Sequence, residues 1–160
     1  MRIGFACLYS WRPHIEQTYY LATLAQKAGH NVFFLTCDAD LPTCYTRELR
    51  DQMAVVECAK CRIGGIRSYA DRNVSSLGQH LNHQPCSAEV PDEWAASSAS
   101  TLGRFESPDD YVSADFLAFK ARLRPAVAMT FEAARAWIRR EKLDAVCVFN
   151  GRMDATRAIF

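Results

Sequence analysis

The chain of 160 residues has the length of one domain, and 49% hydrophobic residues, nine phenylalanines among them, suffice for a single buried core. The net charge is +1 and the basic residues are scattered, which excludes the broad basic surface that nucleic-acid binding requires. No stretch approaches the roughly 20 apolar residues of a membrane span, and the N-terminal apolar run is too short for a secretory signal. We expect a cytoplasmic protein with no transmembrane segment, which leaves peripheral membrane association open.

The first 36 residues predict a βαβ unit. Residues 2–8 are mostly apolar and alternate little, as in a parallel strand that is covered on both faces. Pro13 opens a helical pattern that ends at Gly29, where a left-handed cap residue belongs. Residues 31–36 predict a second buried strand, and we expect the crossover between the strands to be right-handed.

The middle of the chain is less regular. Residues 37–81 break into short pieces that carry cysteines, with a weak strand signal at residues 53–56, and we interpret them as a Cys-rich insertion after the second strand. Residues 82–106 are polar, and we predict a long loop or flexible excursion there, with a short surface helix as the alternative.

The last third predicts a long helix, a strand and the start of another helix. Ser107 is a suitable N-cap and Pro108 a suitable first helical residue, whereas Pro125 predicts a kink or two abutting helices. Residues 144–149 predict a third buried strand, and residues 153–160 begin a further helix. The fold class is therefore α/β, a single Rossmann-like domain over residues 1–160 with an open parallel sheet and helices on both faces. Its few strands and unfinished last helix indicate a fragment of a longer two-domain protein.

Two loops follow predicted strands and form the first candidate site. In open parallel sheets, ligands bind outside the carboxyl ends of the strands, where helix N-termini offer free amide donors. The candidate residues are Ser10, Trp11, Arg12 and His14 in the first loop, and Asn150, Gly151, Arg152 and, one turn further on, Arg157 in the second. Amide and guanidinium groups suit hydroxyls or a carboxylate, and a dinucleotide is not expected without a G-x-G-x-x-G motif. The alternative is that both loops merely cover and cap the sheet edge.

The second candidate site consists of Cys37, Cys44, Cys58 and Cys61, spaced C-x6-C-x13-C-x2-C. Two separated pairs fit a structural zinc ion with four thiolate ligands, an iron–sulfur cluster uses the same ligands, and unrelated thiols are the third interpretation. A thioredoxin-like role for residues 58–61 is disfavoured, because that motif opens a helix and residues 62–65 (Arg-Ile-Gly-Gly) are poor helix formers.

These features together resemble bacterial GT-B glycosyltransferase-like proteins of capsule and surface-polysaccharide biosynthesis. The resemblance is carried by residues 1–5, by Gly-His-Asn-Val at residues 29–32, by the four cysteines, and by Phe-Asn-Gly-Arg at residues 149–152 with Arg157. It implies that this domain is the acceptor-side half, that a nucleotide-sugar donor binds to a C-terminal domain missing from this chain, and that the isolated domain is inactive.

Two hypotheses follow for the function. In the first, the full-length protein transfers a sugar from a nucleotide-sugar donor to a glycan or small-molecule acceptor. Trp11, Arg12, Asn150 and Arg152 line the acceptor side of its cleft, and His14 acts as the base, because a neutral imidazole accepts a hydroxyl proton near neutral pH. In the second, the chain is a non-catalytic, metal-clipped Rossmann-like binding or scaffold domain.

Overall fold

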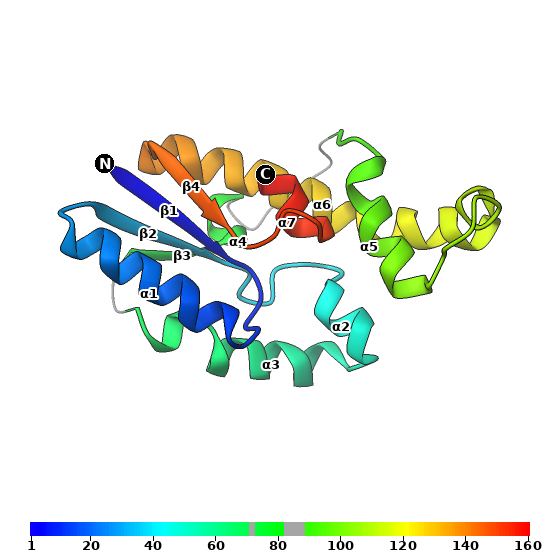
Figure 1. Ribbon diagram of the computed structural model, residues 1–160, viewed down its shortest axis with the longest axis horizontal. Coiled ribbons are helices and arrows are strands. Elements are labelled where there is room, and N and C mark those ends of the chain that lie inside the picture. Colours follow the sequence, from blue (N-terminus) through cyan, green and yellow to red (C-terminus); the bar gives the residue numbers. More distant parts are fainter. Residues whose placement is uncertain (71–72, 82–88) are drawn as a thin grey trace.

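The computed structural model describes residues 1–70, 73–81 and 89–160. In these residues four parallel strands form one open sheet in the order β3–β2–β1–β4, and Figure 1 shows it surrounded by helices. The strands are β1 (Arg2–Cys7), β2 (Asn31–Thr36), β3 (Val74–Ser76) and β4 (Ala145–Val148). The predicted α/β class with a Rossmann-like parallel sheet is confirmed.

The strand order reverses beside β1. β2 and β3 lie on one side of it, and β4, which comes last in the chain, pairs with its other side. The space outside the carboxyl ends of β1 and β4 is therefore the topological switch point at which open α/β sheets bind ligands.

Helices cover both faces of the sheet (Figure 1). α1 (His14–Lys27) packs Ile15 against β1 and β2 on one face, and α6 (Ala114–Glu141) packs Trp137 on the other. The contact between α6 and β1 is tight, because a Cβ added to Gly4 would lie 2.5 Å from Cη2 of Trp137. Both faces are thus dry, which explains why β1 and β2 are continuous apolar runs.

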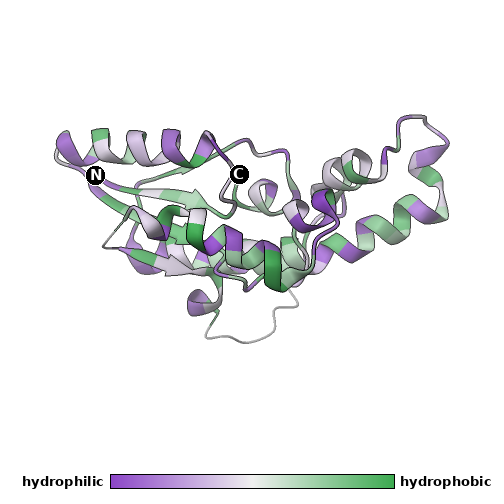
Figure 2. Ribbon diagram, turned by 90° about the horizontal axis from the view of Figure 1, so that it is seen from below, coloured by the Kyte–Doolittle hydropathy of each residue, from purple (hydrophilic) through white to green (hydrophobic). Residues whose placement is uncertain are grey.

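The other helices gather beyond the carboxyl ends of the strands. Near β1–β3 these are α2 (Tyr45–Arg50), α3 (Ala54–Gly64), the 3-10 turn η1 (Ile66–Ser68) and α4 (Leu77–His80). α5 (Glu93–Gly103) and α7 (Asp154–Ile159) pack with the first half of α6 as an extension past the sheet (Figure 1). Figure 2 shows hydrophobic and hydrophilic segments alternating along this extension. Among the described residues, no helix combines the length and apolar character needed to cross a membrane.

In the middle of the chain the structure favours the helical alternative for residues 89–106, and the strand prediction at residues 53–56 is wrong. Most of the described part of this segment is the helix α5, and residues 82–88 lie outside the described part. The small residues Ala95, Ser98 and Ala99 are buried at helical spacing, which lets α5 pack closely against α6. The strand signal at residues 53–56 is instead the start of α3. A helix there turns Glu57 and Cys61, four residues apart, toward the same hollow.

The long helix also differs from its prediction. Its N-cap is Ser113, which accepts a hydrogen bond from Phe116 N, and a separate 3-10 turn, η2 (Asp110–Val112), precedes it. Ser107 instead exchanges local hydrogen bonds with Asp110. The helix continues through Pro125 as one element, so the alternative of two abutting helices is wrong.

Candidate functional site

The loops after β1 and β4 meet at the switch point. Both strands run parallel, so their following loops leave the sheet at one edge, as expected. The closest contact is between His14, the first residue of α1, and Phe149, the residue after β4. Their rings stack with centroids 3.9 Å apart and planes inclined by 23°. The two loops predicted to share a crevice are therefore side by side.

A hollow of about 400 Å³ opens between the second loop and α5, and we call it the Trp11 hollow. Three of the predicted residues, Trp11, Asn150 and Arg152, line it. Its other walls are Tyr45, Ser97, Ser98, Thr101 and Met153. Trp11 stacks on Tyr9 at 5.5 Å and meets the edge of Tyr45 at 5.6 Å, so neighbouring rings hold the indole in place.

His14 lines a second, adjacent hollow of about 340 Å³, together with Phe149 and Thr156. Trp11 belongs to both hollows and lies between them. The Nδ1 atom of His14 is buried without a hydrogen-bond partner. The imidazole is thus close to the proposed acceptor position, but across the indole from the Trp11 hollow.

The remaining predicted residues lie elsewhere. Arg12 is exposed, forms an ion pair with Glu16 and donates to Tyr69 Oη at 2.7 Å. Arg157 is exposed, with its guanidinium carbon 5.8 Å from the centre of the Phe160 ring. Neither side chain lines the Trp11 hollow.

Ser10 and Gly151 also have other roles than the predicted ones. Ser10 lines the cysteine-bearing hollow described below. The left-handed backbone of the second loop is at Asn150, with φ of 48°, and not at Gly151. Gly151 is needed for space, because an added Cβ would lie 2.9 Å from Cβ and Cγ of Phe160. The turn after β4 therefore depends on Asn150 for its conformation and on Gly151 for its packing.

A buried carboxylate under the Trp11 hollow escaped the sequence analysis. Asp154, at the start of α7, is fully buried, and its Oδ1 accepts from Tyr9 Oη at 3.3 Å and from Ser98 Oγ at 3.4 Å. Its Oδ2 has no hydrogen-bond partner. Burial raises the pKa of Asp154 from 3.8 to about 6, and desolvation, with Asp154 close by, raises the pKa of Tyr9 well above 10.0. An acidic residue in a first helical turn is typical of a dipole partner at the surface, so the sequence carries no signal of this burial.

The four predicted cysteines line one hollow of about 630 Å³, which we call the cysteine hollow. It lies where β1 and β2 end and is closed by α2, α3 and η1. Cys7, at the end of β1, also contributes to its wall. The sequence spacing therefore brings these thiols to one place.

The thiols do not form a metal-ligand set. Across the described ranges, which include all four cysteines, no three His, Cys, Asp or Glu side chains are grouped so that they could hold a metal ion. The Sγ atom of Cys61 faces Leu8 O at 4.0 Å, and burial raises the pKa of Cys37 to about 12. As arranged, these side chains are not grouped as the ligands of zinc or of an iron–sulfur cluster, and the metal prediction gains no support.

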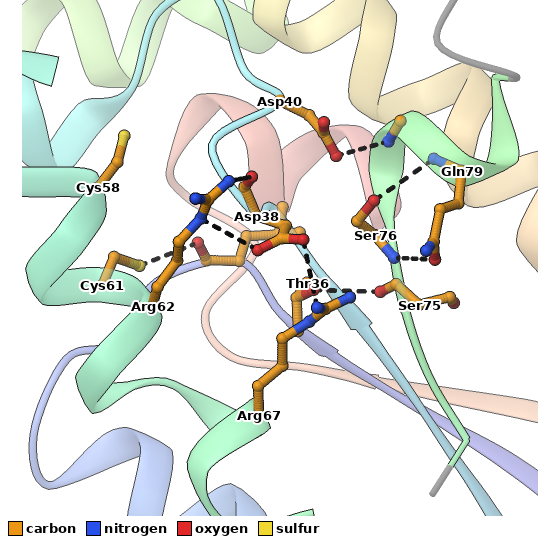
Figure 3. Close-up of polar contacts among 12 residues, drawn as sticks. Thr36, Asp38, Asp40, Cys58, Cys61, Arg62, Arg67, Ser75, Ser76 and Gln79 are labelled. Atoms are coloured by element: carbon orange, nitrogen blue, oxygen red, sulfur yellow. Dashed lines mark hydrogen bonds and ion pairs between the residues drawn. The ribbon is translucent and has the colours of Figure 1, made fainter. Parts of the chain in front are cut away.

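A network of charges borders the cysteine hollow. Figure 3 shows Arg62 and Arg67 converging on Asp38, with ion-pair distances of 3.2 and 3.3 Å. Asp38 and Ala39 both have left-handed backbones, and the next acid, Asp40, accepts from Gly78 N at 2.7 Å. These contacts connect the turn after β2 to η1, α3 and α4, so the hollow has a fixed rim.

Comparison of the chain with known protein families finds no family that matches. No curated protein and no solved structure matches it either. Function is therefore inferred from the fold and from the geometry at the sheet edge.

Proposed function

We propose that the Trp11 hollow binds the sugar acceptor of a GT-B-type glycosyltransferase, with this domain as its acceptor-side half. In this proposal a separate C-terminal domain holds the nucleotide-sugar donor, and the acceptor belongs to a surface glycan or a related molecule. The supporting observation is the lining of the hollow at the switch point. A fixed indole stands there beside the amide of Asn150 and the guanidinium of Arg152.

This lining suits a carbohydrate for a chemical reason. A sugar ring presents C–H groups on its faces and hydroxyls at its rim, so it binds where an aromatic surface is bordered by hydrogen-bonding groups. Trp11 supplies the surface, and Asn150, Arg152, Ser97 and Thr101 supply the polar groups. The buried pair of Tyr9 and Asp154 beneath them fixes the position of the rings.

Sugar binding is tested on this chain by titrating neutral hexoses, N-acetylhexosamines and uronic acids while following the indole N–H signals by NMR. The signal of Trp11 should shift, whereas that of Trp94, which packs between α5 and α6, should not. Replacing Trp11 by alanine should weaken binding about tenfold, since a buried aromatic contact contributes on the order of 1 kcal/mol. Tyr20→Ala, an exposed aromatic on α1, is the matched control. Binding that is as strong in Trp11→Ala as in the wild type contradicts the proposed site.

Catalysis is tested on the complete protein that carries this domain. As the base, His14 would take the proton of an acceptor hydroxyl that reaches past Trp11 into the adjacent hollow. His14→Ala should therefore lower the transfer rate about 100-fold, within the usual contribution of general base catalysis. His14→Gln keeps most of the volume that stacks on Phe149 but cannot act as a base near neutral pH, and should be as slow as the alanine variant. Transfer rates that stay unchanged in both variants reject His14 as the base.

The scaffold alternative requires a bound metal ion, for which the described residues offer no ligand group. Stoichiometric zinc in the purified protein, with no saccharide or nucleotide-sugar binding, would favour it over the transferase.

A further inference from the structure

Cys58 differs in its surroundings from the other cysteines of the cysteine hollow. Its Sγ lies 3.8 Å from Nη1 of Arg47, and that guanidinium is held in place by donating to the carbonyls of Leu41 and Pro42 at 2.9 and 2.8 Å. A fixed guanidinium stabilises an anionic sulfur, the form that attacks disulfides. Burial instead raises the pKa of Cys7, Cys37, Cys44, Cys61 and Cys147, which keeps those thiols protonated.

Two buried acceptors in the same hollow have no hydrogen-bond partner. Glu57 is 3% exposed, and its Oε1 pairs with Arg50. Its Oε2 has no hydrogen-bond partner and forms only a long ion pair with Lys60 Nζ, at 3.9 Å. Thr46 is 7% exposed, and its Oγ1 is also unpaired. Such atoms are costly to bury alone and favour a ligand that donates to them, such as an ammonium or amide group.

The charges around the hollow favour a ligand that also carries carboxylates. Arg47, Arg62 and Arg67 line it against Asp38 and Glu57, so the lining residues carry one more positive charge than negative.

We propose that Cys58 is a modification site for a small thiol compound that carries an ammonium group and carboxylates and arrives as its disulfide. The Cys58 thiolate attacks one sulfur of the incoming disulfide, and that S–S bond breaks as the new one forms. The departing thiolate takes a proton from water. The incoming disulfide is the oxidant, and no other is needed.

Cys61 lies about one turn further along α3, and its Sγ faces the carbonyl of Leu8 at 4.0 Å, a contact drawn in Figure 3. Burial raises the pKa of Cys61, which makes its thiol a poor nucleophile toward a mixed disulfide on Cys58. We therefore expect the mixed disulfide to persist and not to pass on to a Cys58–Cys61 disulfide.

The test uses glutathione disulfide as the probe and peptide mass spectrometry as the readout, in a Cys86→Ser background, because Cys86 lies outside the described residues. We expect Cys58 to be labelled faster than each of the five other cysteines that remain, which are Cys7, Cys37, Cys44, Cys61 and Cys147. Arg47→Gln should slow its labelling about threefold at neutral pH, and Arg47→Lys should restore most of the rate. Arg122→Gln, an exposed arginine on α6 that pairs with Glu48, is the matched control and should change nothing.

Three outcomes would overturn the proposal. The first is faster labelling at another described cysteine. The second is an equal rate of Cys58 labelling by glutathione disulfide and by the uncharged 2-hydroxyethyl disulfide. That result would mean that the exposure of Cys58, and not recognition of charged groups, sets the rate of labelling. The third is a mixed disulfide that accumulates only after Cys61→Ser, which would show that Cys61 resolves it.

Discussion

Trp137→Ala is expected to lower the free energy of unfolding by about 3–5 kcal/mol, the usual cost of removing a buried aromatic side chain. Trp137 is fully buried in the core between α6 and the sheet, and its ring fills the space left by the missing side chain of Gly4. Since small domains have only about 5–15 kcal/mol of stability, much of the domain should unfold at modest denaturant. Urea unfolding followed by far-UV circular dichroism measures the change.

A double-mutant cycle separates this contact from a general loss of packing. Gly4→Ala places a methyl group 2.5 Å from Cη2 of Trp137 and 2.6 Å from Cδ1 of Leu143, and should cost about 1–3 kcal/mol by overpacking. Trp137→Phe removes the outer ring, so Gly4→Ala should cost distinctly less in that background. If the two losses simply add, Trp137 and Gly4 do not contact each other in the way described.

Asp154→Asn is expected to change how stability depends on pH. The pKa of Asp154 is raised by burial from 3.8 to about 6, so the folded protein holds this proton more tightly than the unfolded chain. Stability from this group is fully present below pH 4 and is lost as the pH rises through 6, in total by about 3 kcal/mol. The asparagine variant does not titrate and lacks this loss. The free energy of unfolding of the variant minus that of the wild type should therefore be larger at pH 7 than at pH 4, by about that amount. Urea unfolding at several pH values measures the difference.

The control for Asp154 is Asp115→Asn. Asp115 is also an acidic residue in the first turn of a helix, but it is exposed, so its substitution shows what the loss of a surface carboxylate does under the same conditions. A difference from wild type that does not change with pH for Asp154→Asn would mean that its carboxyl is solvated in the folded protein.

The first βαβ unit could be predicted because local and tertiary signals agree there. The bounds of β2 match the predicted residues 31–36. Val32 and Phe34 face α1 while Phe33 and Leu35 face α6, so the four central positions are apolar. Gly29 takes the predicted left-handed backbone with φ of 82°. The meeting of the loops after β1 and β4 also followed from the sequence, because the carboxyl ends of parallel strands share one edge.

The middle of the chain could not be predicted, because its elements depend on distant partners. α3 contains adjacent valines that favour a strand, yet Val55 is 78% exposed and it is Glu57, paired with Arg50 of α2, that is buried. In the candidate site, Trp11, Asn150 and Arg152 share a hollow, whereas Arg12 and Arg157 point elsewhere because Glu16, Tyr69 and Phe160 attract their guanidinium groups.

The sequence by itself determined the parallel α/β architecture and the edge at which polar loops gather, because hydrophobic periodicity and turn residues act over a few neighbouring positions. Only the tertiary structure decided that Asp154 is buried against Tyr9 and Ser98, and that Arg47 lies beside Cys58. Burial and charge pairing of this kind depend on residues that are far apart in the chain, and local sequence patterns carry no information about such distances.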